Sequence, residues 1–150
     1  SLKFREATES ELPHLIELLA SDPIGKSRET VQSPPLIAYQ NAFKAIVRSE
    51  HNELIVADFC DSIIGMMQLT YIPYLTHKGS WRCLIEGVRI DKQYRGKGYG
   101  RQMFSWAIER AKQKHCRMVQ LTSDKQRSEA LAFYRSLGFI DSHEGFKLKL

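Results

Sequence analysis

Arg95-Gly96-Lys97-Gly98-Tyr99-Gly100 is the stretch from which the rest of this sequence can be interpreted. Its three glycines follow a strand-like segment that ends at Ile90 and precede an amphipathic, helix-like segment. Glycine accepts positive φ angles and lets a ligand approach the backbone closely, and the free N–H groups of a helix N-terminus attract phosphate. With positive charge from Arg95, Lys97 and Arg101, the stretch predicts a loop that binds a pyrophosphate.

Two other phosphate-binding motifs do not fit this stretch. A P-loop needs Ser or Thr after Gly-Lys, whereas Gly98 follows Gly96-Lys97. A dinucleotide fingerprint needs a third glycine where Arg101 stands, and an acidic residue about 20 residues further on, where the chain has Val119 and Gln120. A tight glycine-rich turn without a ligand stays open as the alternative.

Hydrophobic periodicity predicts the elements around this loop. An N-terminal strand is followed by a capping box, Thr8 to Glu11, and by a helix that ends near Asp22-Pro23, before an aperiodic loop at 24–33. Pro34-Pro35 opens a second helix, and Gly87 marks a bulge or a close backbone approach in the third strand of the middle region. The other elements are a hairpin at 53–74, a strand at 81–90, a helix at 98–115, a strand at 116–122, a helix ending at Leu137-Gly138, and one or two strands at 139–150.

This order, βααβββαβαβ, indicates an α/β chain of the α+β type with a mixed, largely antiparallel central sheet. The 150 residues are 43% hydrophobic, which fits a single domain over residues 1–150. No apolar run approaches the roughly 20 residues of a membrane helix, and no signal peptide is expected. The three cysteines are widely spaced, so we expect free thiols in a cytoplasmic protein.

Charge and histidine spacing narrow the classes of function further. The five histidines lack the spacing of metal ligands, so no metal is expected. A net charge of +5 favours anionic partners. The basic residues are dispersed and form no known nucleic-acid-binding pattern, so a nucleic-acid-binding module is the weaker interpretation.

Two runs of residues carry a resemblance to a known family. The run from Val88 to Gly100 resembles the acyl-CoA-binding signature of the GNAT superfamily, Arg/Gln-x-x-Gly-x-Gly/Ala. The run from Ala130 to Phe139 is similar to that family's second signature, Ala-x-x-Phe-Tyr-x-x-x-Gly-Phe. The resemblance covers the whole chain, although the first half matches only in pattern. It implies a single N-acetyltransferase domain with splayed central strands, which transfers an acetyl group from acetyl-CoA to a primary amine.

The resemblance implies Tyr134 as the general acid, which would protonate the departing thiolate. The alternative for Tyr134 is a core aromatic, because it belongs to an apolar helical stripe. Glu86 is the candidate general base, and its position two residues before Val88 predicts that both side chains share one face of the strand. The alternative for Glu86 is a carboxylate paired with a base such as Arg82.

The resemblance also implies which residues bind coenzyme A. The pyrophosphate would lie on the loop, the pantetheine arm would pair with the exposed backbone of the preceding strand, and a backbone N–H near Val88 would bind the oxyanion. The family often has Asn where this chain has Arg127, and an arginine at this position would contact phosphate in place of the Asn-type contact. The expected cofactor-binding residues are Val88, Arg89, Ile90, Arg95, Gly96, Lys97, Gly98, Tyr99, Gly100, Arg101 and Arg127.

The acceptor amine is left unidentified by the sequence. In this architecture its groove resembles a variable surface formed by 24–33, 71–77 and the tail around His143, where Tyr71 and Tyr74 would either wall a pocket or lie exposed. A non-catalytic acyl-CoA-binding regulator is the alternative function, since it needs the loop but neither Glu86 nor Tyr134. A homodimer is compatible with the sequence, and no membrane partner is expected.

Overall fold

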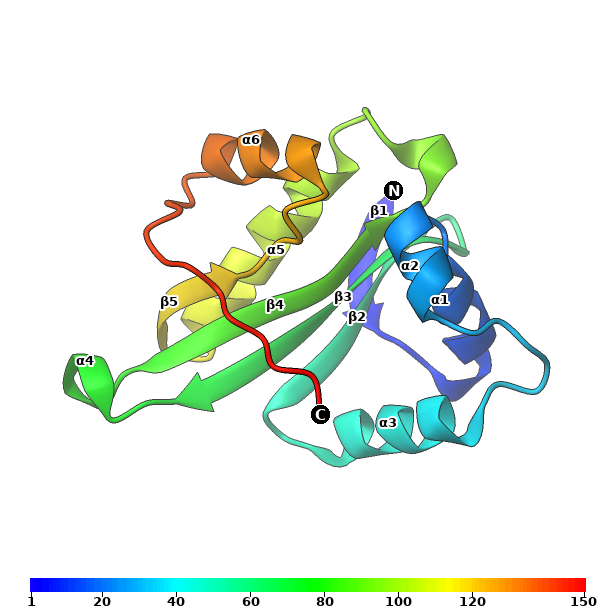
Figure 1. The fold of residues 1–150 in the computed structure, drawn as a ribbon, viewed down its shortest axis with the longest axis horizontal. Helices are drawn as coiled ribbons and strands as arrows, with labels where there is room; N and C mark the ends of the chain where they lie inside the picture. The colour runs from blue at the N-terminus through cyan, green and yellow to red at the C-terminus, as the bar shows by residue number, and fades with distance from the viewer.

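The computed structural model describes all residues, 1–150, and its centre is one five-stranded sheet (Figure 1). The strands lie in chain order, and each pairs antiparallel with the next except β4 and β5, which are parallel. The mixed, largely antiparallel sheet predicted from the sequence is therefore confirmed. The strands are β1 (Leu2–Glu6), β2 (Asn52–Phe59), β3 (Ser62–Pro73), β4 (Trp81–Ile90) and β5 (Cys116–Leu121).

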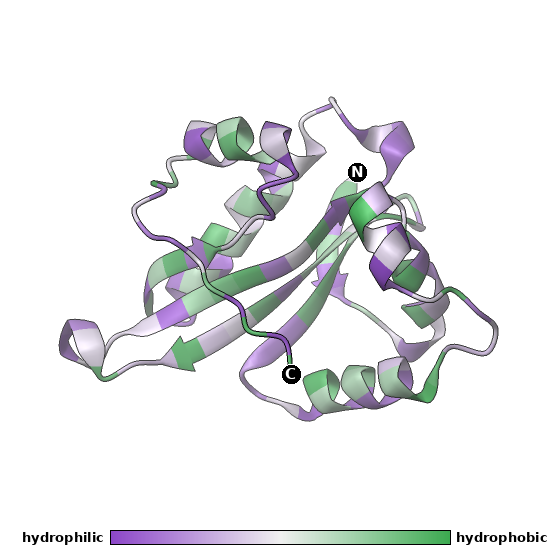
Figure 2. Ribbon diagram, in the orientation of Figure 1, coloured by the Kyte–Doolittle hydropathy of each residue, from purple (hydrophilic) through white to green (hydrophobic).

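Helices cover both faces of the sheet (Figure 1). One face packs against α1 and α3, and the other against α5 and α6. Apolar residues follow the strands between these layers (Figure 2). The helices are η1 (Glu9–Glu11), α1 (Leu12–Leu19), α2 (Pro23–Arg28), α3 (Ile37–Arg48), α4 (Thr76–Gly79), η2 (Lys92–Tyr94), α5 (Tyr99–Gln113) and α6 (Ser128–Ser136).

The largest part of the core lies between the sheet and α5. Met103, Phe104 and Ala107 of α5 are fully buried against Ile64 and Met67 of β3. Burying a large apolar side chain stabilises the folded state by about 1.5–3 kcal/mol. This interface therefore holds α5, and with it the loop before the helix, rigidly on the sheet.

The segment between β1 and α3 contains one helix more than the sequence pattern predicts. The capping box at Thr8 is confirmed, with the Thr8 N–H donating to Glu11 Oε1 at 2.8 Å. The loop expected at 24–33 is wrong in its first part, because α2 begins at Pro23. The Asp22 side chain accepts from the Gly25 N–H at 2.8 Å and so caps this short helix. A helix of six residues is too short to show a hydrophobic period.

A bulge at Gly87 changes which face of the sheet each residue of β4 occupies. Glu86 pairs with Gln68 and Arg89 with Met66, so two residues of β4, Gly87 and Val88, oppose one residue of β3. Gly87 has φ of 63°, which suits glycine. The predicted common face of Glu86 and Val88 is therefore wrong. Val88 packs on the α5 side, whereas Arg89 pairs with Met66, which faces α1.

β4 and β5 separate at the end of the sheet nearest the glycine loop. Their pairing runs from Trp81 with Cys116 to Ile85 with Leu121 and stops there. The second half of β4, from Glu86 to Ile90, has a partner only in β3. The splayed central strands that the sequence resemblance implies are thus present.

The C-terminal segment differs from the prediction. Residues 139–150 form no strand, and α6 is the last element. This segment crosses in front of the sheet (Figure 1) without joining it. A strand needs a partner backbone for its hydrogen bonds, and beyond the Phe139 N–H, which donates to the Tyr134 carbonyl at 3.1 Å, this segment donates no backbone hydrogen bond outside a regular element. None of the helices has the length and apolar character needed to span a bilayer.

Candidate active site

The glycine loop has the backbone shape that a bound anion requires. Gly96 and Gly98 have φ of 76° and 86°, in the left-handed region, and Gly98 is the N-cap of α5. A Cβ atom built on either glycine meets nothing within 4 Å, so the space in front of the loop is open. The loop is an open cradle and not a turn packed against the protein, which argues against the alternative of a tight turn without a ligand.

Six successive N–H groups of this loop, from Gly96 to Arg101, have no acceptor within the protein. No backbone or side-chain hydrogen bond uses the N–H groups of Gly96, Lys97 and Gly98. Those of Tyr99, Gly100 and Arg101 form the first turn of α5, where an intrahelical acceptor is lacking, and the first such bond is Gln102 N–H to the Gly98 carbonyl. Free N–H groups at the positive end of a helix, here one of fifteen residues, are an arrangement that favours phosphate.

The basic side chains of the loop are arranged around this cradle. Arg95 Nε donates to the Ile90 carbonyl at 3.0 Å, and Arg101 Nη2 donates to Ser136 Oγ of α6 at 3.0 Å. The Lys97 ammonium lies 5.7 Å from the centre of the Tyr94 ring. None of these three cations has a carboxylate within 4.0 Å, so their charge is available to an anion.

The predicted backbone contacts on β4 lie in the splayed half of the strand. Val88, Arg89 and Ile90 have no β5 partner. The Val88 carbonyl accepts from Arg89 Nη1 at 2.8 Å, and the Ile90 carbonyl accepts from Arg95. Side chains of the protein, and not a neighbouring strand, thus satisfy these carbonyl groups.

Tyr134 lies in α6 with its ring in an aromatic cluster and its hydroxyl free. The ring centre is 5.6 Å from that of Phe104 and 6.2 Å from that of Phe139. Burial raises the pKa of Tyr134, and the charges of Arg127 and Arg89 act in the opposite direction. The hydroxyl makes no hydrogen bond within the protein. The side chain is therefore both a core aromatic and an unengaged, protonated hydroxyl, so the two interpretations of Tyr134 are compatible.

Glu86 is exposed on the face of β4 that it shares with Arg89. It has no cation within 4.0 Å. The alternative of a pair with Arg82 is excluded, because Arg82 donates to Gln120 Oε1 at 3.0 Å and stacks on the Tyr74 ring at 4.3 Å. Glu86 is a free carboxylate beside the open half of β4.

Arg127 lies apart from the loop. It pairs with Asp22 of the α2 cap at the N-terminal end of α6, whereas Ser136, which contacts Arg101 of the loop, is the last residue of that helix. Nine residues of helix separate these two ends by about 13 Å. The structure thus joins Arg127 to α2, and not to the phosphate cradle.

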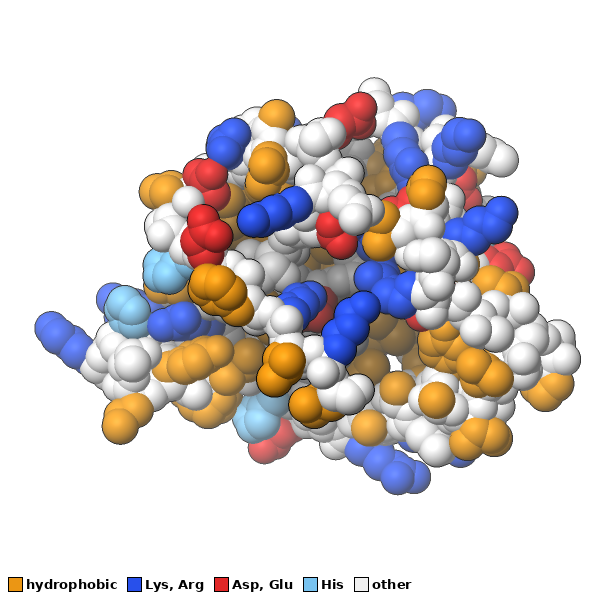
Figure 3. Space-filling view, in the orientation of Figure 1, with side chains coloured by type: hydrophobic (Ala, Val, Ile, Leu, Met, Phe, Trp, Pro, Cys, Tyr) orange, Lys and Arg blue, Asp and Glu red, His pale blue; other side chains and the backbone are white.

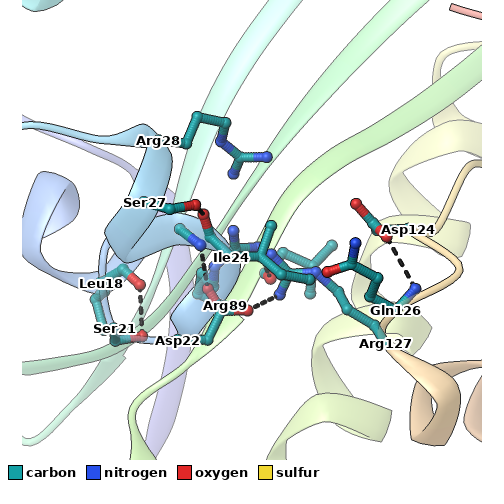
Figure 4. A network of polar contacts seen from close by, with 12 residues as sticks. Leu18, Ser21, Asp22, Ile24, Ser27, Arg28, Arg89, Asp124, Gln126 and Arg127 are labelled. Carbon is teal, nitrogen blue, oxygen red and sulfur yellow. Dashed lines mark hydrogen bonds and ion pairs between the residues drawn. The ribbon is translucent and has the colours of Figure 1, made fainter.

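The sequence did not identify the side chains of Asp22 and Arg28, or the guanidinium of Arg89, as parts of the site. Asp22, Arg28 and the guanidinium of Arg89 lie together with Arg127 between α2, β4 and α6 (Figure 4). Arg89 was expected to contribute only its backbone. The alternation of Val88, Arg89 and Ile90 indicates a solvent-facing arginine, but the structure buries it beside Asp22 and Arg127 (Figure 4).

The acceptor groove predicted from aromatic residues is wrong at Tyr71. Its side chain is only 3% exposed, and its hydroxyl donates to Glu53 Oε1 at 2.5 Å. Tyr71 is therefore a core residue and not a wall of a pocket. A cavity of about 490 Å³ lies near Tyr74, between α4 and the start of β5, and Trp81 and Arg117 line it. It opens at the first residue of β4, a whole strand away from the loop, and contains no predicted catalytic or cofactor-binding residue.

Comparison with known proteins agrees with this geometry. The model of the Acetyltransferase (GNAT) family matches residues 12–139. A crystal structure of a transcriptional regulator from Bacillus halodurans C-125 is 49% identical in sequence and similar with a TM-score of 0.97, and each chain covers 100% of the other. Glucosamine 6-phosphate N-acetyltransferase of Trypanosoma brucei brucei is 29% identical over 99% of this chain and 96% of its own length. Aminoalkylphosphonate N-acetyltransferase of Salmonella typhimurium is 29% identical over 56% of this chain and 54% of its own.

The family match includes both the glycine loop and Tyr134, the two features that the geometry presents as free to bind a ligand. The fold, with its splay between β4 and β5, and the full-length N-acetyltransferase relative agree with that match. The chain belongs to the GNAT family of acetyltransferases, and its reaction is acetyl transfer to an amine.

Proposed function

We propose that the protein binds acetyl-CoA with the pyrophosphate on the N–H groups of Gly96 to Arg101. The single observation that supports this most directly is the run of six free N–H groups at the N-terminus of α5. The open space over Gly96 and Gly98 provides room for the phosphates, and the unpaired Lys97 supplies charge. When bound, acetyl-CoA supplies the acetyl group as a thioester.

The residues around the splay supply the acid and base that acetyl transfer needs. Glu86 takes a proton from the incoming ammonium, directly or through water, since an amine attacks only in its neutral form. A backbone N–H near Val88 binds the oxygen on which negative charge develops, an interaction worth roughly 3 kcal/mol per donor in acyl-transfer sites. Tyr134 donates its hydroxyl proton to the leaving sulfur. Its raised pKa keeps the hydroxyl protonated at neutral pH.

The loop assignment is tested by Gly98→Glu, with acetyl-CoA affinity measured by calorimetry. The new carboxylate lies where the phosphates bind, so we expect affinity to fall at least a hundredfold. Gly79→Glu is the matched control, because Gly79 also has a positive φ, 70°, and no atom within 4 Å of a built Cβ. It carries the same backbone strain at a distant turn and leaves affinity unchanged. Retained micromolar affinity in Gly98→Glu would contradict the assignment.

A regulator that binds acyl-CoA without turnover is the second candidate. One observation favours it: the Bacillus halodurans protein, 49% identical, is described as a transcriptional regulator. The two are separated by a screen of small amines, amino acids, aminoglycosides, polyamines and peptides that detects thiol release from acetyl-CoA. Release with any amine supports the enzyme, and tight acetyl-CoA binding with no release across the panel supports the regulator. All three cysteines are free, which supports a reducing, cytoplasmic location for either.

A further inference from the structure

Arg89 is a buried guanidinium without a counter-ion. It is 9% exposed, and its Nε has no hydrogen-bond partner. Its one hydrogen bond within the protein joins Nη1 to the Val88 carbonyl at 2.8 Å, and no carboxylate lies within 4.0 Å. Charges taken out of water are normally paired, because leaving one unpaired costs several kcal/mol. The missing partner is therefore expected to be an anion that the chain itself does not supply.

Two more arginines flank Arg89, and the two acids whose charges act on it, Asp22 and Glu29, already have partners. Asp22 accepts from the Gly25 N–H and pairs with Arg127. Glu29 pairs with Arg28 at 2.9 Å and accepts from the Tyr39 hydroxyl at 2.8 Å.

Arg89 and Arg127 lie next to each other, with Arg28 of α2 above them (Figure 4), and we call these three residues the arginine cluster. Figure 3 shows the molecule hollowed between these two helices, with Lys and Arg side chains beside the hollow. Arg28 and Arg127 each have a carboxylate partner, so Arg89 is the member of the cluster that lacks one.

The arginine cluster lies beside the proposed acid and base. Arg89 and Glu86 share a face of β4, two register positions apart, which is about 7 Å along the strand. Arg127 is the N-cap residue of the helix that contains Tyr134, and the charges of both Arg127 and Arg89 act on the Tyr134 hydroxyl. A molecule whose amine reaches Glu86 can therefore place a second group, a few bonds away, on Arg89.

The phosphates of coenzyme A do not account for this cluster. Their predicted cradle precedes α5, which packs on the face of the sheet opposite to α1. The Arg89 side chain faces the α1 side. Arg127 lies at the far end of α6 from the Arg101 contact. The anion of the cluster therefore belongs to the second substrate.

We propose that the arginine cluster binds a phosphate or phosphonate group of the acceptor, so that the acceptor is a small primary amine that carries such a group. This inference rests on the proposed function, because it assumes that an amine reaches Glu86. Arginine binds phosphorus oxyanions with paired N–H donors. Two relatives act, by name, on glucosamine 6-phosphate and on aminoalkylphosphonates, both of which combine an amine with a phosphorus oxyanion.

The test compares amines that differ only in the anionic group. Acetylation of 2-aminoethylphosphonate is measured against ethanolamine, glucosamine 6-phosphate against glucosamine, and β-alanine serves as the carboxylate. We expect kcat/KM to be at least a hundredfold higher for the phosphorus-containing member of one pair. In Arg89→Met the ratio of kcat/KM between the phosphorus-containing amine and its partner falls about tenfold to a hundredfold, as for the loss of a charged hydrogen bond. Arg48→Met removes an exposed arginine of α3 and leaves the ratio unchanged.

Calorimetry of 2-aminoethylphosphonate and glucosamine 6-phosphate, with coenzyme A saturating, separates this inference from the proposed function. If either compound binds, if Arg89→Met weakens that binding, and if no amine is acetylated, the result supports the arginine cluster as the anion site and contradicts the proposed enzymatic function. Turnover with equal preference within each pair supports the enzyme and contradicts the cluster. A preference for β-alanine over both phosphorus-containing amines identifies a carboxylate as the anion and overturns the phosphate assignment. If Arg89→Met lowers kcat/KM equally for both members of a pair, the role of Arg89 is structural and the inference is also overturned.

Discussion

Glu53 of β2 and Arg110 of α5 form an ion pair across the interface between the sheet and the helix. Arg110 Nε lies 3.0 Å from Glu53 Oε1, and the Tyr71 hydroxyl donates to the same oxygen. Glu53 is 7% exposed, so the carboxylate is held by its two partners and not by water. The pair ties α5, and the loop in front of it, to the hairpin of β2 and β3.

Replacing this carboxylate by an amide lowers stability in a pH-dependent way. Glu53→Gln leaves Arg110 without its counter-charge, and we expect the free energy of unfolding at pH 7 to fall by roughly 3 kcal/mol, the low end for a broken buried pair, because Arg110 is partly exposed. Burial raises the pKa of Glu53, but hydrogen bonds from Arg110 and Tyr71 outweigh it and the net pKa is lowered.

A group with a lowered pKa in the folded state stabilises above its unfolded pKa, about 4.3, and loses that contribution as pH falls below it. The difference between wild type and Glu53→Gln is therefore expected to shrink from pH 4.3 downward, as measured by urea unfolding. Glu109→Gln, an exposed carboxylate 3.9 Å from Lys112, is the control with no such change. A difference that stays constant from pH 7 to pH 3 would contradict the role of the charge.

Tyr134→Phe separates proton donation from packing. The ring stays in its aromatic cluster and the lost hydroxyl makes no hydrogen bond, so unfolding and acetyl-CoA affinity are expected to stay as in wild type. Turnover falls about a hundredfold, as for the loss of a general acid. Tyr74→Phe, directly after the end of β3 that lies away from the loop, is the matched control in the same thiol-release assay. Unchanged turnover in Tyr134→Phe would remove this residue as the acid.

Gly25→Ala tests the corner that positions Asp22 next to Arg127. A Cβ atom on Gly25 would lie 1.8 Å from the Leu19 carbonyl oxygen and 2.7 Å from Asp22 Oδ1, so the backbone of the α1–α2 corner must move. We expect a loss of about 1–3 kcal/mol in stability by calorimetry. Gly145→Ala, whose Cβ would lie 3.9 Å from Thr122 Cγ2, is the control and changes stability by less than about 0.5 kcal/mol. Equal effects of the two substitutions would show that the corner tolerates the change.

The three free cysteines should react with a thiol reagent at very different rates. Cys60 is exposed, whereas Cys83 is fully buried and burial, followed by the charges of Cys116 and Glu53, raises its pKa to about 12. Because the thiolate is the reactive form, Cys60 is expected to react first and Cys83 only after unfolding. Cys60→Ser should remove the fast phase in the native protein. Rapid modification of Cys83 under native conditions would show that the core between β4 and β5 opens.

The local sequence determined most elements and the proposed donor site. The glycine loop from Gly96 to Gly100, the capping box at Thr8 and the strand with Gly87 are recognisable because each depends on a few neighbouring residues and on φ angles that only certain residue types adopt easily. The order of the strands and of the longer helices up to α6 follows from hydrophobic periods of the same short range, whereas the six-residue α2 shows no such period. The family signatures lie on these local features.

Tertiary structure decided which side chains meet. The bulge at Gly87 turned Glu86 toward the face of Arg89, since a slip of one residue exchanges the faces of a strand. The strand expected after Phe139 is absent because pairing depends on a partner backbone elsewhere in the chain. The arginine cluster joins residues of α2, β4 and the N-terminal end of α6, about a hundred residues apart, and Arg89 is buried where these elements meet. Periodicity indicates which face of a strand a side chain lies on, but only packing determines whether water or a counter-ion surrounds that side chain.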